Sequence, residues 1–259
     1  MKQPVFDAHM HLVDPAFPLV ENEGYLPDPF TVADYRKRTD ELHIAGGAVV
    51  SGSFQAFDQG YLIEALKQLG PTFVGVTQIP GATSDEKILE LHEAGVRAVR
   101  FNVFRGGSAS LGELDRLARR AHDLAGWHAE LYIDAQKIDD DLARTVTALP
   151  AVSIDHLGLT ADGLPNLLRL VERGVKVKAT GFGRIKMDPA TTIRAIMSVD
   201  PTALMVGTDL PSTRAGRPFR DEDFQTIQQT LETEGFTPNQ VAAVFWGNAA
   251  DFYLSVARQ

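Results

Sequence analysis

Three histidines and an aspartate stand where β-rich segments of the chain end. His9 and His11 are separated by one residue near the start of the sequence, and His156 and Asp209 end two later segments. In an extended strand alternate side chains share a face, so His9 and His11 project from one face about 6.6 Å apart. Two such imidazoles suit a metal ion, a developing oxyanion or a bound anion. The alternative is a pair of partly exposed histidines near the N-terminus.

The carboxylates near these histidines differ in what they are expected to do. Asp209 ends the apolar segment Val206-Gly207-Thr208, where a buried carboxylate is costly unless it is paired or catalytic. Asp209 is therefore a candidate general base, or else the cap of the next turn. Asp155 precedes His156, and strand alternation turns its side chain to the opposite face, so a structural role is expected. His128 begins a segment about 13 Å before Tyr132 and is also expected to be structural.

Cationic residues follow the ends of the same segments: Arg100, Arg105, Lys178 and Arg184. Guanidinium groups bind carboxylates through two parallel hydrogen bonds, so this group indicates a small anionic substrate. The alternative for each cation is an ion pair with a nearby acidic residue. Arg214, Arg217 and Arg220 come later and are expected to lie in a solvated loop.

Eight β-rich segments alternate with helical patterns along the chain. Strands are expected at roughly residues 5–11, 48–53, 73–77, 96–102, 128–134, 152–156, 175–180 and 204–209. Helices are expected at about 31–43, 58–69, 84–95, 111–124, 165–173, 189–199, 221–233 and 239–253. A further helix is expected after the fifth strand, ending at residue 149. This pattern predicts a single (β/α)8 TIM barrel over residues 1–259, with the active site at the carboxyl ends of the strands. The long connection at 13–29 is expected to cover that site.

Composition narrows the classes of partner. The chain has 259 residues, a net charge of −9 and no cysteine, so nucleic acid and anionic membrane surfaces are not expected partners. No apolar run approaches the roughly 18 residues of a membrane helix, and no apolar leader follows Met1, so a cytoplasmic location is expected. The oligomeric state is left open.

Several motifs together resemble a known family. They are Phe6-Asp7-Ala8-His9-Met10-His11, Tyr25-Leu26-Pro27, Arg97-Ala98-Val99-Arg100-Phe101-Asn102, Gly126-Trp127-His128-Ala129-Glu130-Leu131-Tyr132, Ile154-Asp155-His156-Leu157-Gly158, Val177-Lys178-Ala179-Thr180 with Arg184, and Gly207-Thr208-Asp209. Over nearly the whole chain they resemble the amidohydrolase superfamily, in the branch related to 2-pyrone-4,6-dicarboxylate lactonase and sugar-acid lactonases. Two positions depart from the dicarboxylate lactonase pattern: Ser212 stands where a histidine is usual, and Arg105 comes one residue early.

The resemblance implies a hydrolase that opens a carboxylated lactone in aromatic or sugar-acid catabolism. It implies Asp209 as the base that activates water, with His9, His11 and His156 around the reacting carbonyl. Arg100, Arg105 and Arg184 would then hold substrate carboxylates, with Lys178 as a further cation. Tyr25, Ser53 and Tyr132 would add hydrogen bonds.

A required cofactor is not expected. Members of the superfamily that depend on an ion usually add a ligand from the fifth strand, where this chain has Tyr132. If a single Zn²⁺ or Mn²⁺ is held, the expected ligands are His9, His11 and Asp209. Three alternatives stay open: a lactone isomerase, a metal-dependent decarboxylase or amide hydrolase, and a non-catalytic barrel that binds organic acids.

Overall fold

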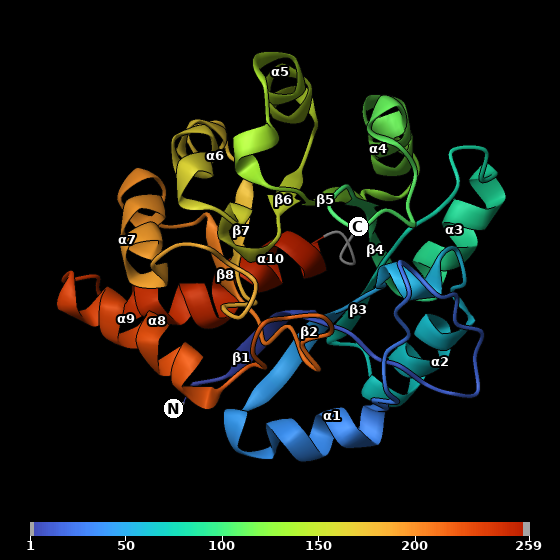
Figure 1. The fold of residues 1–259 in the computed structure, drawn as a ribbon, viewed down its shortest axis with the longest axis horizontal. Helices are drawn as coiled ribbons and strands as arrows, with labels where there is room; N and C mark the ends of the chain where they lie inside the picture. The colour runs from blue at the N-terminus through green and yellow to red at the C-terminus, as the bar shows by residue number, and fades with distance from the viewer. Residues whose placement is uncertain (1–2, 256–259) are drawn as a thin grey trace.

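A computed structural model of the chain describes residues 3–255. Eight parallel strands follow one another in chain order around a barrel, and helices alternate with them on the outside (Figure 1). The strands are β1 (Val5–Met10), β2 (Ile44–Val50), β3 (Phe73–Thr77), β4 (Val96–Asn102), β5 (His128–Tyr132), β6 (Val152–Ile154), β7 (Lys176–Ala179) and β8 (Leu204–Val206). The helices are α1 (Val32–Thr39), α2 (Gly60–Leu69), α3 (Asp85–Glu93), α4 (Leu114–Ala125), α5 (Asp140–Ala148), α6 (Leu164–Val171), α7 (Pro189–Val199), α8 (Asp221–Thr233), α9 (Pro238–Ala242) and α10 (Asn248–Leu254). This is the expected (β/α)8 architecture.

The barrel closes where the chain beyond β8 meets β1. The backbone N–H of Asp209 donates to the carbonyl of His9 at 2.7 Å, and that of His11 donates to the carbonyl of Leu210 at 2.7 Å. The buried carboxylate of Asp7 completes this seam. It accepts hydrogen bonds from the backbone N–H of Thr208 at 2.8 Å, the Thr208 hydroxyl at 2.7 Å and the Tyr35 hydroxyl at 2.9 Å. Asp7 therefore ties β1 to the end of β8 and to α1.

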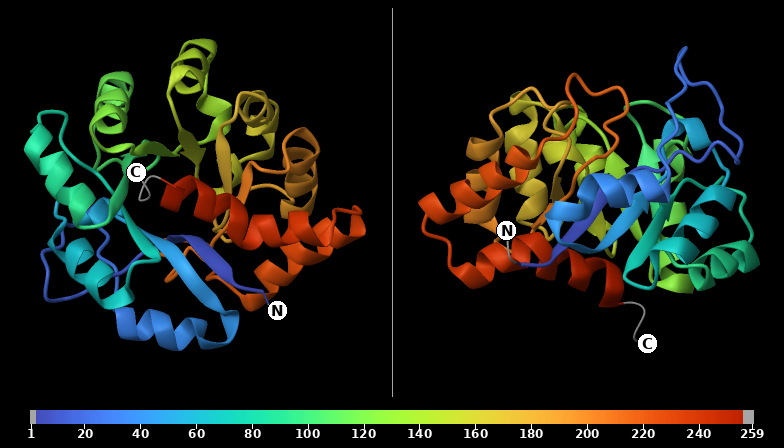
Figure 2. Two further views of the ribbon diagram at one scale, coloured as in Figure 1. Left: turned by 180° about the vertical axis from the view of Figure 1, so that it is seen from behind. Right: turned by 90° about the horizontal axis from the view of Figure 1, so that it is seen from below.

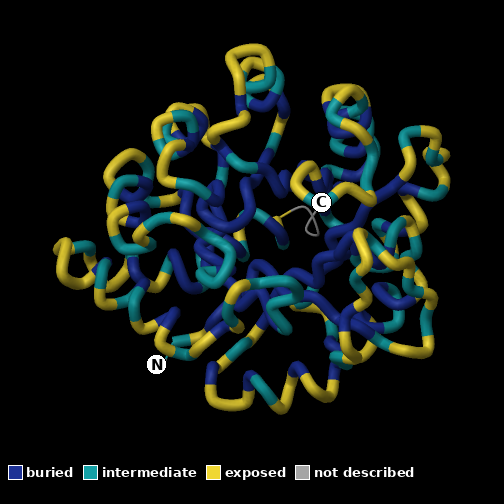
Figure 3. Tube along the Cα trace, viewed as in Figure 1, coloured by how far each residue is buried: buried dark blue, intermediate teal, exposed yellow. Residues whose placement is uncertain are grey.

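The outer helices bury one face each. In α4 the buried side chains recur three or four residues apart, as Leu114, Leu117 and Ala121 illustrate, and Gly126 ends the helix in a left-handed conformation with φ of 68°. Figure 3 shows the result, with buried strands at the centre and exposed turns on the outer side of the helices. No helix within residues 3–255 is long and apolar enough to cross a membrane.

The C-terminal segment covers the amino-terminal end of the barrel. A π-helical turn at 243–247 joins α9 to α10, so the long helix expected over 239–253 is interrupted. In Figure 2 this segment lies across the barrel opening. The Tyr253 ring stacks on Phe6 with centroids 5.4 Å apart, and the His128 ring lies 4.1 Å from that of Phe252. His128 is thus buried at the end opposite the expected site, as its place at the start of β5 predicts.

Candidate active site

The three histidines and the aspartate meet at the carboxyl end of the barrel. The Nε2 atoms of His9 and His11 are 3.3 Å apart. Oδ1 of Asp209 lies 3.8 Å from Nε2 of His9, 3.6 Å from Nε2 of His11 and 4.0 Å from Nε2 of His156. All four side chains are buried. One carboxylate oxygen thus faces three imidazole nitrogens.

Left-handed backbone conformations aim two of these side chains. His156 has φ of 51° and Asp209 has φ of 58°, although neither is a glycine. Such conformations cost on the order of 1–2 kcal/mol each and persist where the surrounding structure imposes them. Gly181 lets the chain after β7 approach closely, because a Cβ there would lie 2.6 Å from Nδ1 of His156. The same Nδ1 is 2.7 Å from the hydroxyl oxygen of Thr180, which fixes the ring.

Burial keeps the three imidazoles neutral. Desolvation lowers the pKa of His156 from 6.5 to about 4, and it also lowers the pKa of His11 and, further, that of His9. Nδ1 of His11 is 2.7 Å from the carbonyl oxygen of Val50, so that nitrogen carries the proton and Nε2 presents its lone pair to the site.

Arg184 is held by Asp209. Its Nε and Nη2 donate to the two carboxylate oxygens of Asp209 at 2.6 and 3.0 Å, in a bidentate pair. Burial favours the protonated form of Asp209, but the Arg184 charge outweighs it, so the pKa of Asp209 lies below its ordinary value. The negative charge of Asp209 in turn raises the pKa of Arg184, against the effect of burial. Arg184 therefore already has an anionic partner in the protein.

Asp155 faces the site, contrary to the expectation from strand alternation. β6 ends at Ile154, and the left-handed conformation of His156 reverses the chain, so both side chains enter the barrel. Oδ1 of Asp155 lies 3.3 Å from Nδ1 of His9, and its Oδ2 accepts from Nη2 of Arg100 at 2.9 Å. The Lys178 charge is the main cause, against burial, of a pKa of Asp155 well below its ordinary value.

Lys178 lies beneath the site and not in its cavity. Its fully buried ammonium group pairs with Glu130 and lies 3.3 Å from Oδ1 of Asp155 and 3.5 Å from Nδ1 of His9. Glu130 in turn accepts from the hydroxyl of Tyr253. Lys178 was expected to contact substrate directly, but in this position it does not line the cavity. Lys178 instead supports the acidic residue that orients His9.

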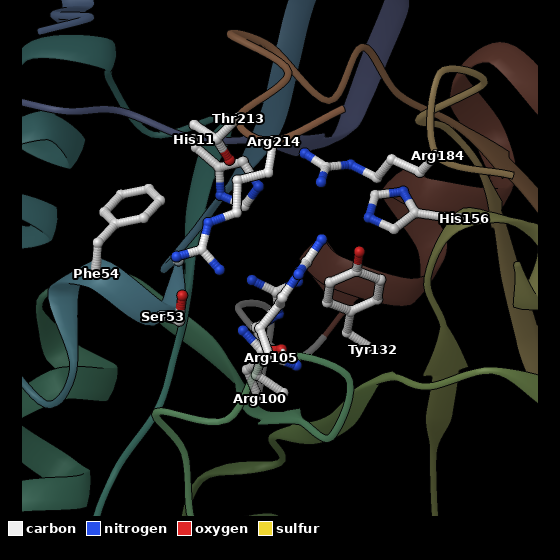
Figure 4. A pocket seen from close by; sticks show the side chains of 12 residues that line it. His11, Ser53, Phe54, Arg100, Arg105, Tyr132, His156, Arg184, Thr213 and Arg214 are labelled. Carbon is white, nitrogen blue, oxygen red and sulfur yellow. Dashed lines mark hydrogen bonds between the residues drawn. The ribbon is translucent and has the colours of Figure 1, made fainter. Parts of the chain in front are cut away.

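A narrow cavity opens above the cluster. Figure 4 shows arginine side chains reaching it from several sides, with the Tyr132 hydroxyl among them. The lining consists of His11, Gly52, Ser53, Phe54, Arg100, Asn102, Arg105, Tyr132, His156, Arg184, Thr213 and Arg214. It includes four arginines and, among the described residues, no carboxylate. The cavity is therefore suited to a small anion.

The expected polar contacts are divided between the cavity and its surroundings. Ser53, Tyr132, Arg100 and Arg105 line it, as expected of substrate contacts. Tyr25 does not; its ring lies 4.6 Å from the guanidinium carbon of Arg214. Arg214 is the cationic residue that the sequence did not distinguish, because it was expected in a solvated loop and instead lines the cavity.

The donor atoms of His9, His11 and Asp209 can hold a metal ion. Ligands about 2.0–2.1 Å from a tetrahedral Zn²⁺ are roughly 3.3–3.4 Å apart, close to the separations of 3.3, 3.6 and 3.8 Å observed. His9 decides between two arrangements. Protonated on Nδ1 toward Asp155, it turns a lone pair to the ion site. Protonated on Nε2, it hydrogen-bonds to His11 instead.

The fold and the cluster define a class: a (β/α)8 barrel whose histidines and aspartate converge at the carboxyl ends of the strands. The chain belongs to the amidohydrolase family, whose sequence profile matches residues 6–254. A 2-pyrone-4,6-dicarboxylate hydrolase of Comamonas testosteroni is 33% identical over 157 residues, which cover 59% of this chain and 51% of that protein. This match spans about half the length of that relative. A D-galactarolactone isomerase of Agrobacterium fabrum is 27% identical and covers 91% of this chain and 85% of its own.

Solved structures share the fold. A probable 2-pyrone-4,6-dicarboxylic acid hydrolase of Acinetobacter baumannii, with citric acid bound, superposes with a TM-score of 0.81 at 21% identity and covers 96% of this chain and 98% of its own. An amidohydrolase of Burkholderia multivorans with bound zinc has a TM-score of 0.72 at 14% identity, and the match covers 96% of this chain and 99% of that one.

Proposed function

We propose that this protein hydrolyses a carboxylated lactone to the open hydroxy acid. The observation that carries the proposal is the buried group of Asp209 and three neutral imidazoles beside a cavity lined by four arginines. Family membership and relatives named for a pyrone dicarboxylate and a sugar-acid lactone support it. The citric acid in a structural neighbour supports a small polycarboxylate as ligand.

Asp209 is the proposed general base. Water between Asp209 and the lactone carbonyl gives a proton to the carboxylate and its oxygen to the carbonyl carbon. Collapse of the tetrahedral intermediate breaks the ring C–O bond, and Asp209 returns the proton to the leaving oxygen. The Nε2–H of neutral His156 stabilises the oxyanion, because His156 carries its proton on Nε2 when the Thr180 hydroxyl donates to Nδ1.

Arg184 couples substrate charge to this chemistry. In the free protein its two hydrogen bonds hold Asp209 as a weakly basic carboxylate. A substrate carboxylate that takes up part of the guanidinium relieves that bond, and burial then makes Asp209 more basic. Acidic lactones are therefore preferred over neutral ones.

A divalent ion is not required in this scheme, although His9, His11 and Asp209 would be its ligands. Such an ion would supply a Lewis acid that polarises the carbonyl. Arg184 opposes its binding, because the guanidinium occupies both oxygens of Asp209 and repels a second cation.

Isomerisation of a lactone is the second candidate, favoured by the relative that aligns over 91% of this chain. The test is a screen of purified protein against carboxylated lactones in weakly buffered solution. Hydrolysis releases one acid equivalent for each lactone consumed, whereas isomerisation consumes lactone without acid. Consumption of no acidic lactone would contradict both candidates.

A further inference from the structure

Two of the four cavity arginines have buried partners of their own, and two do not. Arg100 pairs with Asp155 and Arg184 with Asp209, and both carboxylates are fully buried. Arg105 and Arg214 are more exposed, and the carboxylate that pairs with them lies on the surface.

Arg105 and Arg214 share one exposed carboxylate. Oε2 of Glu23 lies 3.2 Å from Nη1 of Arg214 and 3.5 Å from Nη1 of Arg105. The Glu23 side chain is 61% exposed, whereas those of Arg214 and Arg105 are 13% and 31% exposed. An ion pair with an exposed partner is weak, so this contact is readily exchanged.

A tight turn presents Glu23 from the loop between β1 and α1. Asn22 and Tyr25 exchange backbone hydrogen bonds of 3.1 and 3.2 Å, and the two residues between them, Glu23 and Gly24, have φ of 51° and 72°. These are the features of a two-residue hairpin turn of type I′. The Glu23 side chain can leave the arginines while the turn stays in place, since the backbone bonds of the turn are made by Asn22 and Tyr25 and not by Glu23.

Both arginines have contacts that do not depend on Glu23. The side-chain oxygen of Asn22 accepts from Nη1 of Arg214 at 3.0 Å, and the Tyr25 ring packs on the same guanidinium. The Arg105 guanidinium packs on the Phe104 ring at 4.9 Å, and its buried Nε has no hydrogen-bond partner among the described residues. A preorganised cationic pair with an unused donor suits an incoming oxyanion.

We propose that Arg105 and Arg214 form a second anion subsite at the mouth of the cavity, and that Glu23 occupies it until a ligand carboxylate displaces it. Arg214 then selects ligands that carry a second carboxylate beyond the one bound at Arg184. This inference deepens the proposed function and rests on it for the nature of the substrate. The subsite itself is defined by binding and not by turnover.

The test measures citrate binding by titration calorimetry at low ionic strength, with acetate as the monocarboxylate comparison. Replacing Glu23→Gln removes the competitor and should tighten citrate binding about 2–5-fold, since an exposed ion pair is worth up to about 1 kcal/mol, which corresponds to a factor of about five. Replacing Arg214→Gln should weaken it about tenfold. In the double variant, Glu23→Gln should give less than half of its effect in the wild-type background, and acetate binding should change by less than twofold throughout.

Glu21→Gln is the matched control, because it removes the same charge from the same loop at an exposed position. Equal tightening in Glu21→Gln and Glu23→Gln would mean a general charge effect and would overturn the subsite. No tightening in Glu23→Gln, or no citrate binding by the wild type, would also overturn it. If Arg214→Gln does not fold, Glu23→Gln and its control still decide the matter.

The failure of this inference is distinct from that of the proposed function. The expected citrate shifts in a protein that consumes no lactone would leave the subsite standing and contradict the lactone reaction. Lactone hydrolysis with unchanged citrate binding in both Glu23→Gln and Arg214→Gln would support the lactone reaction and contradict the subsite.

Discussion

At the scale of single residues, the site is a set of charges arranged in two layers. The upper layer joins Asp209 to Arg184 beneath the cavity, and the lower layer joins Asp155 to Arg100 and Lys178. His9 lies between the two carboxylates, with Nδ1 toward Asp155 and Nε2 toward Asp209. The position of that one proton therefore links the layers.

Lys178 is expected to be essential to the stability of the lower layer. Lys178→Met leaves the fully buried carboxylates of Glu130 and Asp155 without their shared cation, which should cost about 3–5 kcal/mol in the free energy of unfolding. Urea unfolding measures the loss. The double variant Glu130→Gln with Lys178→Met should recover part of it, and a change below about 1 kcal/mol in Lys178→Met would contradict this account of the network.

Metal content is the second test at this scale. Because Arg184 already balances the charge of Asp209, we expect activity to survive exhaustive chelation and the purified protein to hold well below one equivalent of metal. Elemental analysis is compared with assays of chelated and Zn²⁺- or Mn²⁺-reloaded protein. Stoichiometric metal, with activity lost on chelation and regained on reloading, would make this a metal-dependent enzyme.

At the scale of elements, the seam between β1 and the end of β8 is the contact that positions the site. It fixes Asp209 against His9 through one backbone hydrogen bond, and Asp7 accepts from four donors beside it. A change at this seam should therefore affect stability and site geometry together.

Asp7→Ala tests the seam. It leaves the buried Thr208 and Tyr35 donors without an acceptor, and we expect a loss of about 2–4 kcal/mol, since each stranded donor costs roughly 1–3 kcal/mol. The comparison is Asp139→Ala, which removes an exposed helix cap from α5 and should cost about 1 kcal/mol. Equal losses in the two variants would show that Asp7 is no more than an ordinary capping residue.

The bounds of many strands and helices could be predicted from the sequence. β3, β4, α7 and α8 have the expected bounds because hydrophobic periodicity and helix caps specify them locally. β2 begins at Ile44 and not at Ala48, because glycines at 46 and 47 fit against the neighbouring strands, and that fit depends on the assembled sheet.

The site was predictable only where strand ends carry distinctive residues. His9, His11, His156 and Asp209 do meet, since parallel strands bring their carboxyl ends together. Asp155 could not be oriented because a left-handed residue follows it, which alternation does not describe. The partners of Arg184, Lys178 and Arg214 lie on distant segments, so only the folded chain identifies them.

At the scale of the whole molecule, the buried histidines make stability depend on pH. Folding keeps His156 neutral, with its pKa lowered by burial from 6.5 to about 4, and the pKa values of His9, His11 and His128 are lowered too. The unfolded chain takes up these protons below pH 6.5, so the free energy of unfolding falls as pH drops toward 4. Each histidine contributes about 1.4 kcal/mol per unit of pKa shift.

Asp7 acts in the opposite direction. Burial raises its pKa from 3.8 to about 6, so between those values the folded state holds a proton that the unfolded chain lacks. The histidines outweigh this single carboxyl, and we expect the midpoint of urea unfolding to fall steadily from pH 7 to pH 4.5. His156→Gln should reduce the slope. A midpoint that is flat or rises over this range would mean that the histidines are charged in the folded protein.

The central claim is that Asp209 acts as the base in lactone hydrolysis. The most direct measurement is acid release by Asp209→Asn and wild-type protein on a carboxylated lactone found in the screen. The amide keeps the size of the side chain but cannot accept the proton, so kcat should fall at least ~10²-fold while urea unfolding shows a folded protein. Turnover close to that of the wild type in a folded Asp209→Asn variant would contradict the account.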